Sequence, residues 1–374
     1  MHACRLQEQR GPRRTQEFYG EFWRGDLDLA PRFFEIALKA NPSYEESQWL
    51  RAAIAEKREK LMALQPEQLL AEISKGDLAA QDAIPLVRAL VRYGPFDLRT
   101  TIWNRIDNTP FVKLPHCFTV GTGYGSFSGD SLDIIPMCVY YFGQWEPEIS
   151  QLIEQRLRPG DTFVDVGANT GWYTLLAAHT VGPTGRVVAI EASPTNFLRL
   201  KENVADNRLG NVRLVNEAVW NSEAFLSFFQ GPPSNSGVST VLPSFAEPRG
   251  CAPAGRIRAW PLPELLSPDE MAALRILKID VEGAEREVLQ GLEPVLDSLP
   301  DDLEIFLELT PTEYNVDDLL RPLRKRGFRA WIIPNPYSWE FYLNFSALRR
   351  RDNYQELLGI PEDQVDVLLS RTGP

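Results

Sequence analysis

The segment that most constrains the fold is residues 161–173, DTFVDVGANTGWY. Its pattern is that of a short buried strand over residues 162–166, a turn with two glycines, and a helix that begins near Trp172. The strand carries an acid, Asp165, near its end, and the turn has the form Gly-x-Asn-x-Gly. Glycine turns and helix N-termini bring backbone N–H groups close to a ligand. We therefore expect a ligand to bind where this strand meets this helix.

Strands and helices alternate along the chain from about residue 148. Apolar and β-branched runs predict further strands at 186–190, 212–215, 273–279, 303–309, 329–333 and 339–345. Helical patterns cover residues 148–157, 194–207, 282–291 and 316–325. This order predicts an α/β fold with a doubly wound, mostly parallel seven-stranded sheet, whose ligands bind at the carboxyl ends of the strands.

Two regions with different patterns are predicted. Residues 1–95 carry apolar positions at helical spacing, which predicts an N-terminal helical region that acts as a lid, a dimerisation surface or a docking module. Residues 96–374 form the α/β domain. This domain includes an irregular insert at 222–268, rich in proline, glycine and serine, and long loops of this kind more often form a lid or a substrate wall. The glycines at 121–125 predict a hairpin turn rather than a phosphate loop.

Charge and composition exclude several classes of partner. The formal net charge is −12, which argues against a nucleic-acid backbone or an anionic membrane as the main partner. The four cysteines are scattered and form no Cys-x-x-Cys pair, and only three histidines are present, so neither a disulfide framework nor a zinc site is expected. No apolar leader or membrane-length run is seen, and we expect a cytoplasmic protein.

The turn distinguishes between two kinds of nucleotide ligand. A dinucleotide site needs a second and a third glycine, for the approach of the pyrophosphate and for close helix packing. Asn169 and Trp172 occupy those positions here. S-adenosylmethionine carries no phosphate and does not need them. Its carboxylate can lie near the helix N-terminus, its ammonium near Asp165 or a backbone carbonyl, and its ribose diol on Glu191 at the end of the next strand. We therefore favour S-adenosylmethionine over a dinucleotide and over a nicotinamide oxidoreductase.

Three motifs resemble one known family. Residues 165–171 (DVGANTG), 191–194 (EASP) and especially 277–285 (LKIDVEGAE) are similar to the FkbM family of class I methyltransferases. The resemblance covers about residues 138–333, and it includes the segment at 145–147 (WEP) and the asparagines of 203–207. It departs from the family at Pro263, where an aspartate is frequent.

The resemblance implies a Rossmann-like fold and methyl transfer from S-adenosyl-L-methionine to a hydroxyl of a small metabolite, such as a sugar, a polyketide or another intermediate of natural product biosynthesis. It also implies a set of cofactor-binding residues along the motifs and strand ends. These are Trp145, Glu146, Asp165, Gly167, Ala168, Asn169, Gly171, Trp172, Glu191, Ala192, Ser193, Glu217, Ala218 and Asp280.

A hydroxyl acceptor must lose a proton during methyl transfer, and a carboxylate near the methyl group can take it. Asp280, at the tip of the fourth strand, is the first candidate, and Glu282 and Glu308 follow. In an alternative mechanism, Asp280 and Glu308 hold Mg²⁺ for a diol acceptor. We do not favour this alternative, because Leu309 stands where a third ligand is expected, and we predict no metal.

The acceptor pocket is the least defined part of the prediction. We expect it to include Tyr141, Trp145, Ser239 and Thr240. The N-terminal helices are expected to pack on the neighbouring domain and to support a homodimer. In a further alternative, the cofactor fold is a non-catalytic scaffold whose N-terminal helices bind a partner.

Overall fold

The computed structural model describes residues 117–345 and 354–373, together with Arg88, Val91, Thr100 and Trp103. The N-terminal helical region predicted at residues 1–95 therefore lies outside the described residues, apart from Arg88 and Val91. The prediction of a lid, a dimerisation surface or a docking module in that region remains a prediction.

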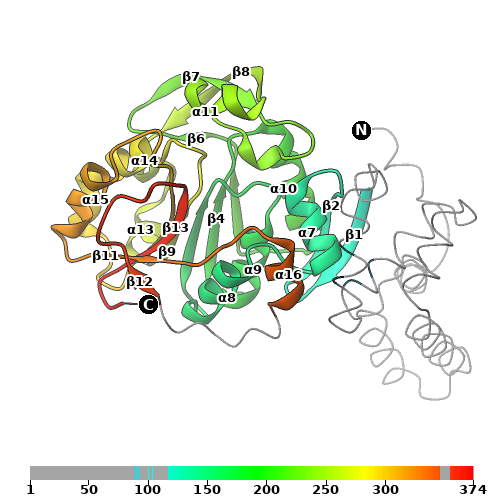
Figure 1. The fold of residues 1–374 in the computed structure, drawn as a ribbon. Coiled ribbons are helices and arrows are strands. Elements are labelled where there is room, and N and C mark those ends of the chain that lie inside the picture. The colour runs from blue at the N-terminus through cyan, green and yellow to red at the C-terminus, as the bar shows by residue number, and fades with distance from the viewer. Residues whose placement is uncertain are drawn as a thin grey trace, which may run out of the picture.

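A central eight-stranded sheet organises the described residues (Figure 1). Its order is β12-β11-β13-β10-β9-β3-β4-β5. Neighbouring strands from β10 to β5 run parallel, whereas β13 is antiparallel to both β10 and β11. The strands are β3 Thr162–Val166, β4 Arg186–Ile190, β5 Val212–Val215, β9 Leu274–Ile279, β10 Glu304–Leu309, β11 Arg329–Ile332, β12 Gln355–Glu356 and β13 Val365–Ser370. The α/β class and the mostly parallel doubly wound sheet are confirmed.

The far edge of the sheet differs from the prediction in two respects. Eight strands are present instead of seven, because β12 and β13 come from the C-terminal segment. The strand predicted at residues 339–345 is wrong, since the segment forms helix α16, Trp339–Asn344. Ser338 caps this helix by accepting a hydrogen bond from the Phe341 N–H. Packing of Trp339 and Tyr342 against Phe142 overrides the strand propensity of these aromatic residues.

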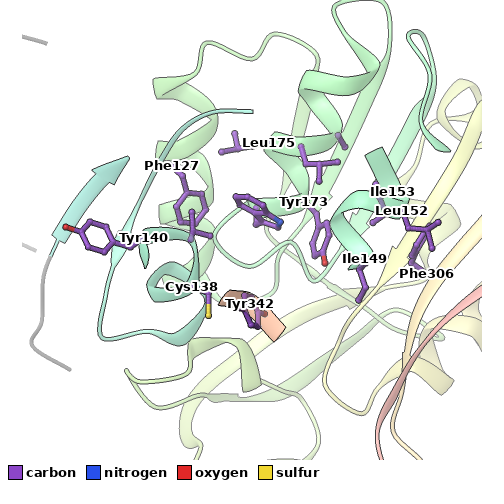
Figure 2. Close-up of a cluster of buried hydrophobic side chains, with 14 of the residues drawn as sticks. Phe127, Cys138, Tyr140, Ile149, Leu152, Ile153, Tyr173, Leu175, Phe306 and Tyr342 are labelled. Atoms are coloured by element: carbon purple, nitrogen blue, oxygen red, sulfur yellow. The ribbon is translucent and has the colours of Figure 1, made fainter. Parts of the chain in front are cut away.

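Helices cover both faces of the sheet. Successive strand residues point to opposite sides, so each buried strand contributes side chains to two cores. Phe163, Ile276 and Phe306 join one core, which Figure 2 shows in part. Their sequence neighbours Val164 and Leu277 join the core on the other face. The first core includes residues from α7 Ile134–Phe142, α8 Pro147–Arg156, α9 Trp172–Val181 and α16, and the second from α12 Leu262–Leu265, α14 Glu285–Leu292, η3 Glu293–Ser298 and α15 Val316–Arg324.

Smaller elements complete the fold. The predicted hairpin is present as β1 Cys117–Thr122 and β2 Gly125–Asp130. Helix α10, Pro194–Asp206, contacts β2, and the short helix α13, Pro268–Ala272, precedes β9. Among the described residues, no helix combines the length and the apolar character needed to cross a bilayer.

The insert predicted to be irregular is largely ordered. A three-stranded sheet spans it, made of β6 Ala218–Val219, β7 Ala224–Gln230 and β8 Ala252–Trp260. Between β7 and β8 lie η1 Ser236–Val238, α11 Pro243–Ala246 and η2 Glu247–Arg249. Figure 1 shows β7, β8 and α11 together above the central sheet.

Candidate active site

A cavity of about 310 Å³ opens at the carboxyl ends of β3, β4, β9 and β10. The insert forms one wall, with Asn235, residues 237–241 and Arg249, and the start of α7 forms another, with Ile134 and Ile135. Hydrogen bonds tie these two walls together, because the Ile134 N–H donates to the Ser234 carbonyl and the Ser236 N–H donates to Asp133 Oδ1. The cavity therefore lies where a doubly wound sheet is expected to bind its ligand.

The glycine turn after β3 forms the floor of the cavity. A Cβ atom at Gly167 would lie 1.8 Å from the backbone oxygen of Asp280, and the φ of Gly167 is +85°. A side chain at this position is therefore excluded both by space and by backbone conformation. Gly171 precedes α9 with φ +99°, and a Cβ there would lie 2.8 Å from Leu200 Cδ1. The two glycines bring the turn against the end of β9 and against α10.

Glu191 binds the backbone of this turn from the end of β4. Its Oε2 accepts a hydrogen bond from the Asn169 N–H and its Oε1 accepts one from the Ser193 N–H, both at 2.7 Å. Burial raises the pKa of Glu191 to about 7, against the opposing effect of these two hydrogen bonds. Each carboxylate oxygen keeps a second lone pair, which suits it to accept a hydrogen bond from a ligand hydroxyl.

Asp165 lies beneath the cavity rather than in its wall. Its Oδ2 accepts a hydrogen bond from the Thr174 hydroxyl at 2.8 Å, while its buried Oδ1 has no hydrogen-bond partner. Burial raises the pKa of Asp165, and the neighbouring Lys278 opposes the rise. Lys278 lies beside Asp165 in the register of β3 and β9.

Three carboxylates gather where β9 and β10 end. An oxygen of Asp280, one of Glu282 and one of Glu308 lie within 4.8 Å of one another. Asp280 Oδ2 is paired with Lys278 Nζ at 2.7 Å. Burial, and then repulsion from Asp280, raise the pKa of both Glu282 and Glu308 well above their usual range. This cluster is the densest group of acids in the cavity wall.

Glu146 adds a fourth acid from the junction of α7 and α8. Tyr173 Oη donates to its Oε2 and Tyr337 Oη donates to its Oε1, each at 2.5 Å. The φ of Glu146 is +40°, a backbone conformation that a non-glycine residue rarely adopts. The buried carboxylate of Glu146 thus connects helix α9, through Tyr173, with the segment before α16, through Tyr337.

The predicted residues divide into two groups. Most of them line the cavity: Trp145, Glu146, Gly167, Asn169, Glu191, Ala192, Glu217, Ala218, Ser239, Thr240, Asp280, Glu282 and Glu308. Others lie behind the wall: Asp165, Ala168, Gly171, Trp172 and Ser193 are buried supports of the turn and of the helix starts. Trp172, for example, donates its Nε1–H to Ser150 Oγ at 2.8 Å.

One of the predicted acceptor residues, Tyr141, needs correction. Tyr141 is only 1 % exposed and packs edge-on against Trp103 at 5.5 Å in the core, so it is not a wall of the cavity. The hydroxyls of Ser239 and Thr240 are already used, since they donate to the carbonyls of Ser236 and Glu282. These two residues hold the insert in place.

Several wall residues were not predicted. Tyr337, Arg249, Phe228 and Asn235 all line the cavity. Tyr337 lies in a proline-flanked segment that was assigned no function, and the others lie inside the insert, where no periodicity marked them. Only the aromatic character of Tyr337 could have drawn attention to it.

Comparisons with known proteins match the part of the chain that contains most of this cavity. Residues 165–330 match the model of the methyltransferase FkbM domain. A hexuronic acid methyltransferase, AglP, from Haloferax volcanii is 27 % identical over 41 % of this chain and 59 % of its own. The 31-O-demethyl-FK506 methyltransferase FkbM from Streptomyces tacrolimicus is 26 % identical over 48 % of this chain and 77 % of its own.

Two further matches complete the comparison. An arsenite methyltransferase from Halobacterium salinarum is 26 % identical over 53 % of this chain and 45 % of its own. The chain thus spans about half the length of the arsenite methyltransferase and of the hexuronic acid methyltransferase. The crystal structure of an FkbM methyltransferase from Methylobacillus flagellatus has a TM-score of 0.33 at 13 % identity, covering 80 % of this chain and 60 % of its own.

The cavity also fits the predicted cofactor. Gly167 leaves the floor free of a side chain, and Glu191 offers acceptor positions for a ribose diol. The sheet is that of a Rossmann-like class I methyltransferase, and the cofactor that belongs to it is S-adenosyl-L-methionine. The predicted family is confirmed: residues 165–330 of this chain form a methyltransferase FkbM domain.

Proposed function

We propose that the protein transfers the methyl group of S-adenosyl-L-methionine to a hydroxyl oxygen of a small metabolite. The observation that carries the proposal is the position of Asp280, Glu282 and Glu308, which share one cavity with Glu191. A ribose acceptor and a group of proton acceptors thus lie in the same cavity, at the ends of neighbouring strands.

The roles of the residues follow from their contacts. Glu191 would hold the ribose, while the turn at Gly167 and Asn169 would hold the methionine end of the cofactor. When bound, the cofactor supplies a methyl group already activated by a sulfonium. Asp280 would take the proton of the acceptor hydroxyl. Lys278 binds only its Oδ2 in the hydrogen bonds described, which leaves Oδ1 for the acceptor.

The choice of oxygen as the methylated atom draws on both the site and the relatives. The cavity wall offers carboxylates as bases, and a hydroxyl acceptor needs a base more than a soft nucleophile does. One relative is named for an O-demethyl substrate and another for a hexuronic acid. The arsenite methyltransferase is named for a different acceptor, so the methylated atom has to be tested directly.

Two measurements test this function. Calorimetric titration of the purified full-length protein with S-adenosyl-L-methionine should show saturable binding. Incubation with cofactor and a panel of hydroxyl compounds should then add the mass of one CH₂ unit to an acceptor, at an oxygen located by NMR. No cofactor binding would instead favour the scaffold alternative. Methylation at a carbon, nitrogen or arsenic atom would contradict the O-methyltransferase proposal.

A metal-assisted form of the same reaction is the second candidate. The structure adds Glu282 to Asp280 and Glu308, so three carboxylate oxygens lie close enough to bind one divalent cation. Such an ion would orient a diol and lower its pKa. We still favour the metal-free form, in which methyl transfer is unchanged when EDTA is present. If EDTA abolished activity and added Mg²⁺ restored it, the metal-assisted mechanism would be correct.

Three further predictions lie outside the described residues or the comparisons and are retained as proposals. We propose that the protein works in the cytoplasm, that it binds neither nucleic acid nor membrane, and that residues 1–95 support a homodimer. Light scattering of the full-length protein, and of a variant that lacks residues 1–95, tests the dimer.

A further inference from the structure

We propose that residues 231–239 form a lid over the cofactor side of the cavity, and that Asp133 is the positioning residue that latches this lid through Ser236. The inference rests on the proposed methyl transfer, since it concerns how the same cavity admits and releases S-adenosyl-L-methionine. It follows from the hydrogen bonds that hold the lid, from the residues that the lid covers and from the size of the cavity.

The lid is a loop whose two ends are joined. It leaves β7 after Gln230 and ends before Thr240. Phe229 and Thr240 exchange two backbone hydrogen bonds, of 2.9 and 3.0 Å, across this neck. The Gly231 N–H also donates to the Ser239 hydroxyl, at 3.0 Å. The neck therefore fixes where the lid is attached, and the middle of the lid is left to be held by other parts of the chain.

The middle of the lid is held by α7 and α10. Both carboxylate oxygens of Asp133, directly before α7, accept hydrogen bonds from Ser236, Oδ1 from its N–H at 3.2 Å and Oδ2 from its hydroxyl. The Ile134 N–H donates to the Ser234 carbonyl at 3.1 Å, and Asn196 Nδ2 donates to the Ser236 carbonyl at 3.3 Å. Asp133 is only 7 % exposed, and hydrogen bonds to a carboxylate are among the stronger ones in proteins. Asp133 is therefore the main latch.

The latched lid lies against the turn assigned to the cofactor. A Cβ atom at Gly237 would lie 3.3 Å from Ile135 Cδ1 and 3.8 Å from Asn169 Nδ2. Gly237 and Val238 line the cavity together with Asn169 and with Glu191, the proposed ribose acceptor. A ligand that lies on Glu191 therefore touches the glycine turn and the lid at once.

The size of the cavity requires part of its wall to move. The volume of about 310 Å³ is at the lower end of the range, about 300 to 1,000 Å³, of sites that hold one drug-sized ligand. Methyl transfer needs the cofactor and an acceptor in the cavity together. The ends of β3, β4, β9 and β10 are held by the hydrogen bonds of the parallel sheet. Residues 231–239 include no strand, so the lid can move without disrupting a sheet.

Stopped-flow binding of S-adenosylhomocysteine to the full-length protein tests the latch, with tryptophan fluorescence as the signal because Trp145 lines the cavity. In Asp133→Ala, the dissociation rate constant should rise by at least about tenfold, since two hydrogen bonds that close the lid are lost. The association rate constant should stay the same or increase, because an unlatched lid does not obstruct entry. A purely structural role of Asp133 would instead slow association.

Variants of Ser236 test the other side of the latch. Ser236→Ala should raise the dissociation rate constant by at least about threefold, whereas Ser236→Thr, which keeps a hydroxyl, should stay within about twofold of the original protein. In the double variant with Asp133→Ala, Ser236→Ala should add less than about twofold, because both changes break the same contact. The control is Ser227→Ala, an exposed serine on β7 outside the cavity, which should change nothing.

Hydrogen–deuterium exchange gives a readout that needs no reaction. The N–H groups of Ser236 and Ile134 exchange when the lid opens. S-adenosylhomocysteine should slow their exchange, and Asp133→Ala without ligand should speed it. The N–H groups of Phe229 and Thr240 should keep their protection in the same variant, because the neck stays closed. This pattern distinguishes a lid that opens from an insert that unfolds.

Three results would overturn the proposal: dissociation within about twofold of the original rate in both Asp133→Ala and Ser236→Ala, slower association in both variants, or lid exchange that S-adenosylhomocysteine does not change. If Asp133→Ala does not fold, the comparison of Ser236→Ala with Ser236→Thr decides. Titration of the unaltered protein with S-adenosylhomocysteine separates this failure from that of the methyltransferase function. A protein that binds the compound but shows one of these results has no such lid, whereas one that does not bind it contradicts both.

Discussion

Lys278 and Asp280 form an ion pair of 2.7 Å at the end of β9, and Lys278 is almost fully buried there. The ammonium also lies over the Tyr173 ring, 4.8 Å from its centroid. Burial raises the pKa of both Glu146 and Asp165, and the charge of Lys278 opposes this rise. One buried cation thus stabilises the ionised forms of carboxylates from three segments of the chain.

Asp280→Asn should remove the proposed base while it keeps the shape of the site. We expect the rate of methyl transfer to fall by about 10²- to 10⁴-fold, the usual contribution of a general base. Cofactor affinity should fall much less than the rate. The control is Asp301→Asn, at a fully exposed carboxylate. Steady-state kinetics together with calorimetry would contradict the role if cofactor binding fell as much as the rate.

Gly167→Ala should abolish cofactor binding, because the new Cβ would lie 1.8 Å from the Asp280 carbonyl oxygen. Gly160→Ala is the matched control. Gly160 also has a positive φ, of +97°, but its nearest neighbour is 3.9 Å away. Gly160→Ala should therefore lower the free energy of unfolding only by the conformational strain, about 1 to 2 kcal/mol. Thermal unfolding and titration with S-adenosylhomocysteine measure both effects, and equal behaviour of the two variants would contradict the packing argument.

Protein stability should fall as the pH rises from about 4.5 to about 7, in part because of Glu285. Burial raises the pKa of Glu285 from 4.5 to about 7, although hydrogen bonds from Tyr314 and from the Gly283 N–H oppose the rise. In that window the folded protein binds a proton that the unfolded chain has lost. The free energy of unfolding therefore decreases with pH, and this one group contributes up to about 1.4 kcal/mol per pH unit. Glu285→Gln should flatten the curve in thermal unfolding series. An unchanged slope would show that Glu285 is not protonated there.

Cofactor affinity should rise as the pH increases through about 7. The pKa of Glu191 is raised to about 7 by burial, and its ionised form is the better acceptor for ribose hydroxyls. Calorimetric dissociation constants for S-adenosylhomocysteine at a series of pH values test this. The rise should be absent in Glu191→Gln, which should also bind more weakly at every pH. An increase of the same size in that variant would assign the effect to another group.

The sequence was sufficient to predict which residues meet where β3, β4, β9 and β10 end. Gly167, Asn169 and Gly171 form the turn because strand, glycine spacing and helix start are all local features. Glu191, Asp280 and Glu308 were predicted at strand ends, and parallel strands bring such ends to one edge. The structure places these residues around one cavity.

The cavity wall around Tyr337 could not be predicted, because it depends on contacts between distant segments. Tyr337 reaches Glu146 across 191 residues of sequence. The error at residues 339–345 has the same origin, since packing against α7 decides the helix. Tyr141 was expected in the pocket because aromatic residues suit pockets and cores equally well, and only its burial against Trp103 distinguishes the two.

Calorimetric titration with S-adenosyl-L-methionine tests the central claim most directly. We predict saturable binding by the full-length protein, with a dissociation constant in the range of about 1 µM to 1 mM that is usual for enzyme substrates. Binding should be lost in Gly167→Ala and strongly weakened in Glu191→Ala, and NAD should not compete. Absence of binding, or unchanged binding in both variants, would contradict the assignment of this cavity.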